Sequence, residues 1–297
     1  MSRNSERIGA VEQPTEPPKQ SIQQEKESSF FSFPSPTELV DLPSKGLWYP
    51  EGHPVRGRET IEIGYMTTKH EEILVNRTFI EKGVVIDKLL DALMIDPKIP
   101  SKELFSCDRK ALMIAARISG YGTQYKPNVR CPDCGASSPQ EFDLRELKPK
   151  EIDESLNVSD RGTFVIPLHQ NPADDSSPLI ANVEVRMLKG GDEERIAKTA
   201  EQKKKKKLPE EPIADLFKEI IVSVKKPNGE EGSVEDFIQQ APMYYMVHLR
   251  EAYKDLSPNL DMEFFFTCPK CEAENILDIP MNANFFRHNQ QVSRKRS

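Results

Sequence analysis

The sequence has no apolar run near the roughly 18 residues that a membrane-spanning helix needs. It also lacks a Gly-rich phosphate loop followed by Lys-Ser or Lys-Thr, a Gly-x-Ser-x-Gly turn and a His-Glu-x-x-His pair. Its net charge of −7 gives it no general attraction to nucleic acid or to an acidic membrane surface. These absences predict a soluble protein that is not an enzyme.

Four of the five cysteines form two Cys-x-x-Cys turns, Cys131 to Cys134 and Cys268 to Cys271. Two such turns supply the four thiolates of a tetrahedral metal site. The turns are separated by 133 residues (135 to 267), whereas zinc ribbons usually have roughly 12–20. One ion would therefore join the middle of the chain to its end. We predict a structural Zn²⁺ site whose ligands are Cys131, Cys134, Cys268 and Cys271.

Other interpretations of these cysteines remain. Disulfides or free thiols are disfavoured, because the polar N-terminus carries no signal peptide and this indicates a reducing compartment. Cys-Pro-x-Cys-Gly also resembles the iron-binding turn of rubredoxin, which leaves a redox iron site open. A catalytic metal is disfavoured, because four sulfurs leave no position for water and the five histidines do not cluster with the cysteines. Cys107 has no partner at this spacing, which predicts a buried small residue rather than a nucleophile.

Composition divides the chain into three parts. Residues 1–37 are rich in Pro, Gln, Ser and Glu and predict a disordered tail. Residues 38–285 predict one domain that includes both cysteine pairs, and 286–297 a flexible basic C-terminus. Three phenylalanines close the N-terminal tail, and a rigid Pro- and Gly-containing arm follows at 41–50. Such apolar residues anchor a tail onto its own domain or onto a partner, and the candidates for partner binding are Phe30, Phe31, Phe33, Trp48 and Tyr49.

The local patterns predict an α+β fold of mixed helices and short antiparallel strands, closed by a four-Cys zinc-ribbon-like site. Alternating residues predict strands at 60–66, 163–168, 182–188, 221–225, 262–266 and 276–279. Apolar stripes and capping residues predict helices at 86–95, 108–119, 190–207, 213–220, 234–239 and 242–253. Asp108 is the expected N-cap of the second of these helices, and Gly120 its expected C-terminal glycine.

The run Lys203 to Lys207 has two interpretations. It could contact phosphates, and with the basic residues 294–296 this favours a zinc-ribbon nucleic-acid-binding regulatory protein as the alternative function. It also closes a predicted helix, where the dipole favours cations, and Glu210 and Glu211 follow directly. The acidic net charge favours the second interpretation.

The order of several features carries a resemblance to a known family. Residues 42–47 (Leu-Pro-Ser-Lys-Gly-Leu) are followed by Met66-Thr67-Thr68, by the helix with Asp87 to Leu90, by Asp108 and Arg117, and by Ser119 to Gly122 just before the first cysteine pair. Over about residues 38–285 the chain resembles the baseplate-hub proteins of T4-like contractile-tailed bacteriophages.

This resemblance implies a late viral protein that assembles the baseplate hub, either as a structural part or as an assembly chaperone. Its partners would be other phage tail and baseplate hub proteins, rather than nucleic acid or a membrane. It would be found in the host cytoplasm during assembly or in the tail baseplate of the virion. The family supplies no catalytic residues.

Overall fold

The computed structural model describes residues 36–171, 174, 176–281 and 285–286. Contacts divide the chain into Met1–Pro34 and Ser35–Ser297, and the following concerns the second unit. Phe30, Phe31 and Phe33, proposed above for partner binding, lie outside the described residues. The same holds for most of the predicted tails.

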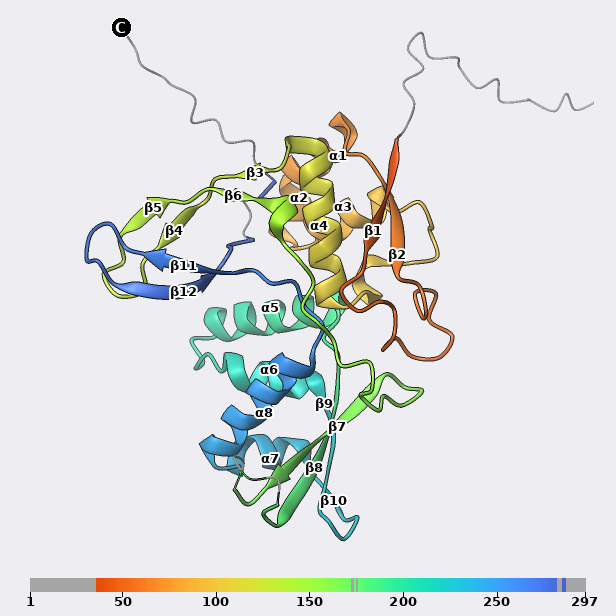
Figure 1. The fold of residues 1–297 in the computed structure, drawn as a ribbon, viewed down its shortest axis with the longest axis vertical. Coiled ribbons are helices and arrows are strands. Elements are labelled where there is room, and N and C mark those ends of the chain that lie inside the picture. Colours follow the sequence, from red (N-terminus) through yellow and green to blue (C-terminus); the bar gives the residue numbers. More distant parts are fainter. Residues whose placement is uncertain (1–35, 172–173, 175, 282–284, 287–297) are drawn as a thin grey trace, which may run out of the picture. The chain divides into compact units, whose positions relative to one another are not determined.

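The described residues form the α+β fold that the sequence predicts (Figure 1). The α-helices are α1 (Thr68–Val75), α2 (Arg77–Glu81), α3 (Val85–Leu93), α4 (Ser106–Tyr121), α5 (Gly190–Lys205), α6 (Pro212–Ile220), α7 (Val234–Gln240) and α8 (Met243–Leu256). The strands are β1 (Thr37–Asp41), β2 (Thr60–Gly64), β3 (Gln124–Tyr125), β4 (Asn128–Arg130), β5 (Ser137–Pro139), β6 (Phe142–Asp143), β7 (Thr163–His169), β8 (Leu179–Arg186), β9 (Ile221–Lys225), β10 (Glu231–Gly232), β11 (Glu263–Thr267) and β12 (Glu274–Asp278). Two 3₁₀ turns, η1 (Ser101–Glu103) and η2 (Leu144–Glu146), complete the list.

The strands pair only with antiparallel neighbours. One sheet has four strands in the order β10-β9-β8-β7, and the others are two-stranded: β1-β2, β3-β6, β4-β5 and β11-β12. The predicted hairpin of β7 and β8 is confirmed, with Phe164 opposite Val185. The inward residues of this sheet belong to the main core, which also contains the apolar stripes of α3 and α4. One continuous core therefore supports both helical regions.

Helix α4 differs from its prediction at both ends. It begins at Ser106 and ends before Gly122, which has a φ of 82°, so Asp108 is not the N-cap and Gly120 is not the terminal glycine. Asp108 lies in the first turn and is buried. Its carboxylate accepts hydrogen bonds from the Ser44 backbone (3.0 Å), the Ser44 hydroxyl (2.6 Å) and the Tyr49 hydroxyl (2.8 Å). Asp108 thus holds the 41–50 arm on α4.

The arm residues expected to bind a partner are instead part of the core. Trp48 is 3% exposed and Tyr49 is fully buried. The Tyr49 ring stacks between Phe105 and His53, with centroid distances of 3.8 and 4.3 Å, and its hydroxyl accepts a hydrogen bond from the Phe105 backbone. The sequence of the arm predicted a partner contact because it does not reveal the hydrogen-bond acceptor, Asp108 on α4. Trp48 and Tyr49 offer no surface for partner binding.

The chain returns to α4 after β12. The Tyr125 hydroxyl donates to the Pro280 carbonyl (2.7 Å), and Phe285 meets the Tyr125 ring edge-on. The buried Arg117 guanidinium lies over both rings. Phe286 is also buried, although the sequence placed it in the flexible C-terminus. The buried core therefore includes Phe286.

A buried ion pair explains why α5 begins with glycine. Arg109 on α4 pairs with Asp87 on α3 (2.7 Å) and donates to the Ser101 carbonyl (3.2 Å). A Cβ at Gly190 would overlap the Arg109 guanidinium, whereas a Cβ at Gly191 would meet nothing closer than 3.5 Å. Gly190 is thus required by close approach rather than by its backbone angles.

We expect Gly190→Ala to lower the free energy of unfolding by about 2–4 kcal/mol, because Arg109 must leave Asp87 or α5 must move away. Chemical denaturation of the purified protein measures this change. The matched control is Gly191→Ala, which adds the same methyl group in the same helical turn and should cost less than about 1 kcal/mol. Equal costs for the two variants would contradict this account.

The lysine run is partly used inside the fold. Lys203 pairs with Asp215 (2.8 Å) and Glu211 (3.1 Å), which ties α5 to α6, and Lys205 pairs with Glu201 (2.7 Å). These pairs support the structural interpretation of the run over nucleic-acid binding.

Candidate metal centre

Each cysteine pair lies at the tip of a two-stranded ribbon. β4 and β5 flank Cys131 to Cys134, and β11 and β12 flank Cys268 to Cys271. The two ribbons lie side by side although they are distant in sequence (Figure 1). The sequence predicts extended chain on either side of the first cysteine pair, but not the bounds of β4 and β5, since three residues are too few for an alternating pattern to be recognised.

The two tips share one backbone conformation. In each, the residue after the second cysteine donates its N–H to the carbonyl of the first: Gly135 to Cys131 (3.0 Å) and Glu272 to Cys268 (2.9 Å). Both donors have a left-handed backbone, with φ of 70° and 58°. Glycine adopts this conformation freely, whereas Glu272 does so at some cost. The turn directs both sulfurs of each pair to the same side.

The four sulfur atoms form a compact cluster across the two tips. The Sγ atoms of Cys131 and Cys271 are 3.7 Å apart, those of Cys134 and Cys268 are 3.6 Å apart, and all four lie within 4.8 Å of one another. A tetrahedral ion with metal–sulfur bonds of about 2.3 Å would separate its sulfurs by about 3.8 Å. A disulfide needs about 2.05 Å. The cluster therefore fits a metal ion and is not a pair of disulfides.

The protein environment favours a thiolate at one of these positions. Backbone N–H groups of Cys271 and Lys270 point at the Cys268 sulfur and lower the pKa of its thiol to about 6. The Ala273 N–H acts in the same direction on Cys271, but hydrogen bonding with the other three thiols and burial together outweigh it and raise the pKa of Cys271 to about 12. Four sulfurs this close cannot all be anionic without a cation among them. A metal ion can supply that charge.

Apolar packing and a hydrogen bond join the two ribbons. Val129, Cys131, Phe266 and Cys268 form a small buried cluster that is separate from the main core. A hydrogen bond from the Asn275 side chain to the Asp133 carboxylate (2.8 Å) also crosses between the tips. An isolated two-stranded hairpin is at best marginally stable. A metal ion bound by all four sulfurs would join the two ribbons directly.

The fifth cysteine lies apart from this cluster. Cys107 is buried beside Asp108, and burial raises the pKa of its thiol well above the usual value. The prediction of a buried small residue is confirmed. In the described part of the chain, the four clustered cysteines are the group of His, Cys, Asp or Glu that could hold a metal ion.

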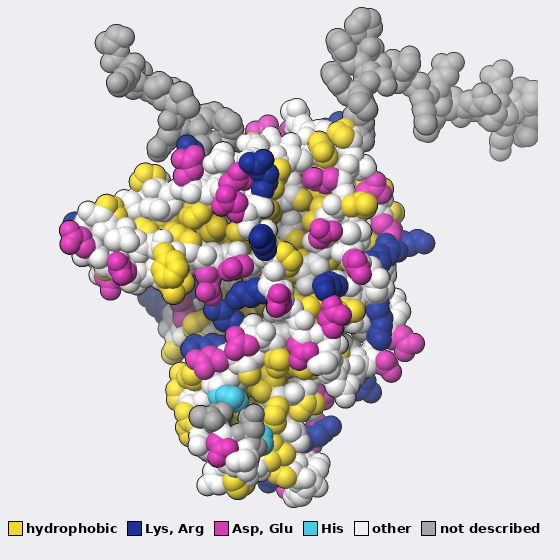
Figure 2. Space-filling model, viewed as in Figure 1, with side chains coloured by type: hydrophobic (Ala, Val, Ile, Leu, Met, Phe, Trp, Pro, Cys, Tyr) yellow, Lys and Arg dark blue, Asp and Glu magenta, His cyan; other side chains and the backbone are white. Residues whose placement is uncertain are grey.

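The second ribbon also carries an exposed apolar pair that sequence reasoning missed. Phe265 is 87% exposed and Ile276 is 59% exposed, and they face each other across β11 and β12. Hydrophobic side chains are visible over the ribbons in Figure 2. The alternation of Phe264, Phe265 and Phe266 contained the signal, since the middle residue must point away from its neighbours.

Comparison with known proteins places the chain in a family. The model of the family described as T4 bacteriophage base plate protein matches residues 37–287. The chain belongs to this family. The match begins at the first residue of β1, includes both cysteine pairs and ends just after the buried Phe286. The resemblance to a T4-like baseplate protein is confirmed. No curated protein and no solved structure matches the chain.

None of the described helices is both long enough and apolar enough to cross a bilayer.

Proposed function

We propose that this member of the baseplate family is a non-catalytic protein of the baseplate hub, acting as a structural part or as an assembly chaperone. The observation that carries the proposal is the family match, which spans the whole domain. The family implies association with other baseplate and tail proteins and a place in the virion tail. Assembly at the hub and an earlier stage in the host cytoplasm are our more specific proposals.

We further propose that the four cysteines bind Zn²⁺ as a structural ion. The sulfur distances and the four-thiolate donor set support a tetrahedral soft-metal site. Zinc or iron could occupy such a set, and we propose zinc because tetrahedral four-Cys sites are typical structural zinc sites. A red, iron-containing protein would overturn this choice in favour of the rubredoxin-like alternative.

Mass spectrometry of purified virions beside infected-cell lysates tests the hub proposal. A structural part is expected in both samples with the other hub proteins, and a chaperone in the lysate complex alone. Recovery with nucleic acid and without any tail protein would instead favour the nucleic-acid-binding alternative.

We propose two apolar contacts for the partner proteins. One is the Phe265–Ile276 pair, two large apolar side chains that lie side by side and are mostly exposed to solvent. The other consists of Phe30, Phe31 and Phe33, which lie outside the described residues.

Phe265→Asp is expected to reduce recovery of tail proteins with the tagged chain by about tenfold or more, since aromatic anchors dominate binding energy at interfaces. Melting temperature and metal content should stay unchanged, because the side chain is exposed. The matched control is Val165→Asp, an exposed apolar residue on β7 in the four-stranded sheet. Equal recovery with both variants would contradict a contact at Phe265.

A further inference from the structure

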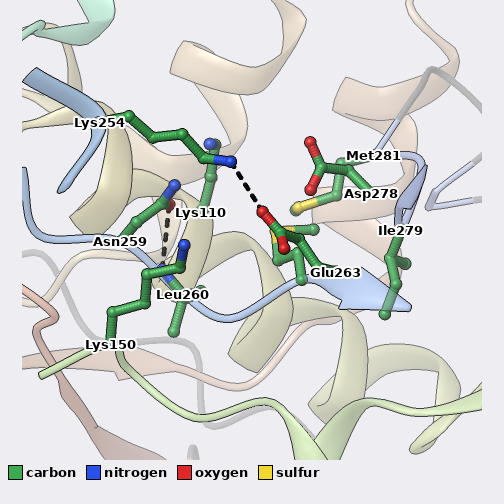
Figure 3. Close-up of a pocket in the computed structure, with 10 residues that line it drawn as sticks. Lys110, Lys150, Lys254, Asn259, Leu260, Glu263, Asp278, Ile279 and Met281 are labelled. Carbon is green, nitrogen blue, oxygen red and sulfur yellow. Dashed lines mark hydrogen bonds and ion pairs between the residues drawn. The ribbon is translucent and has the colours of Figure 1, made fainter. Parts of the chain in front are cut away.

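A small pocket lies where the β11-β12 ribbon joins the rest of the domain (Figure 3). Its volume is about 210 Å³, and its apolar lining includes the buried Leu260, Met262 and Ile279. Sites for small molecules and cofactors usually measure about 300–1,000 Å³. The pocket is therefore suited to one or two amino-acid side chains rather than to a nucleotide.

Three lysines reach this pocket from different parts of the chain. Lys110 comes from α4, Lys150 from the segment after η2, and Lys254 from α8 (Figure 3). The segment with Lys150 is fixed in place, because its backbone N–H donates to the Asn259 carbonyl (2.8 Å). The ammonium groups are thus brought together by tertiary structure and not by a local lysine run.

The Glu263 carboxylate of the pocket is ion-paired with Lys254, and Lys150 acts on it electrostatically at longer range. Lys254 forms an ion pair with Glu263 (2.8 Å), and Glu263 followed by Asp278 raises its pKa. Within the described residues, Lys110 and Lys150 have no ion pair. Three lysines against two carboxylates leave the lining with a net positive charge.

One more donor is available in the pocket. The Asn259 side-chain oxygen accepts a hydrogen bond from the Leu260 backbone (3.0 Å), which fixes its amide group. The half-buried Lys110 and Lys150 side chains and the Asn259 amide N–H lie beside the apolar lining of the pocket. Together they form a complementary environment for a carboxylate with a hydrophobic neighbour. Charges at such sites interact more strongly than on an open surface.

We propose that this pocket binds an acidic segment of a partner protein. A Glu or Asp side chain of that segment accepts hydrogen bonds from Lys110 and Lys150, and an adjacent apolar side chain packs on Leu260, Met262 and Ile279. The proposal rests on the proposed function for the identity of the partner as a baseplate protein. It adds a charged contact to the two apolar contacts proposed above.

The test is fluorescence anisotropy with the full-length protein and a labelled hexapeptide of alternating Glu and Leu. The same peptide with Gln in place of Glu serves as the uncharged probe, and inorganic phosphate as the competing anion at matched ionic strength. Wild type is expected to bind the Glu peptide at least about tenfold more tightly than the Gln peptide. Phosphate is expected not to compete.

The decisive variant is Lys110→Met with Lys150→Met, which keeps the side-chain length and removes both charges. It should lose the preference for the Glu peptide while its melting temperature stays within a few degrees. The control is Lys204→Met with Lys206→Met, which removes the same charge from the end of α5, where the described residues show no ion pair for either lysine. This control should bind the Glu peptide as wild type does.

Three outcomes would overturn the proposal: no preference for the Glu peptide, an equal loss in both double variants, or displacement of the peptide by phosphate. The last would make the site a phosphate site instead. These outcomes are separate from the test of the proposed function. A protein that enters the baseplate but does not bind the peptide refutes only the pocket, whereas a protein absent from tail complexes refutes the hub role whatever the peptide does.

Discussion

Replacing Cys268 by serine is expected to remove the bound metal and to release the two ribbons from each other. Metal binding and folding share one free energy, which is about 10–16 kcal/mol in small zinc modules. The loss should be smaller here, because most of the buried apolar residues belong to the main core and not to the small cluster of the ribbons. We expect the melting temperature to fall by on the order of 10 °C and the metal content to fall from about one ion per chain to none. Calorimetry and elemental analysis measure the two effects.

The chain contains its own control for this substitution. Cys107→Ser makes the same chemical change at a buried cysteine outside the cluster, so it should retain the metal and show only a packing effect. Cys131→Ser should behave like Cys268→Ser, since its sulfur belongs to the other pair of the same cluster. Full metal content and unchanged melting of the Cys268 variant would refute a shared site.

Asp108→Ala is expected to lower the free energy of unfolding by about 3–5 kcal/mol. The substitution leaves three buried donors without an acceptor: the Ser44 backbone, the Ser44 hydroxyl and the Tyr49 hydroxyl. The 41–50 arm should then detach from α4 and expose Trp48. Urea denaturation followed by the fluorescence of this single tryptophan reports both effects.

An exposed aspartate on another helix provides the comparison. Asp255→Ala on α8 removes the same carboxylate where no buried donor depends on it, and should cost less than about 0.5 kcal/mol. A similar small cost for Asp108→Ala would show that the arm is held by apolar packing alone.

The elements that were predicted well are those whose signals are local. The β7-β8 hairpin, α5 with its opening glycines and α7 with its Ser233 cap all follow from patterns within a few residues. Trp48 and Asp108 were misread for the opposite reason. The environment of each depends on the segment of the other, about 60 residues away in sequence. Taken alone, the segment of Trp48 predicts a partner contact, and Asp108 predicts a helix N-cap.

The two candidate sites differ in the same respect: one has a local sequence signal and the other has none. Cysteine spacing alone identified the four residues that the fold brings together, because a Cys-x-x-Cys turn is itself a local structure. Sequence could not show that Cys131 lies next to Cys271 rather than Cys268. The lysine pocket had no sequence signal at all, since its basic residues come from three separate elements and only the fold places them together.

X-ray absorption spectroscopy at the zinc edge, on the purified full-length protein with its metal content measured, tests the central claim most directly. The account predicts about one zinc ion per chain, surrounded by four sulfur atoms at about 2.3 Å. A protein without bound metal, or an ion with nitrogen or oxygen ligands in place of any of the four sulfurs, would contradict it.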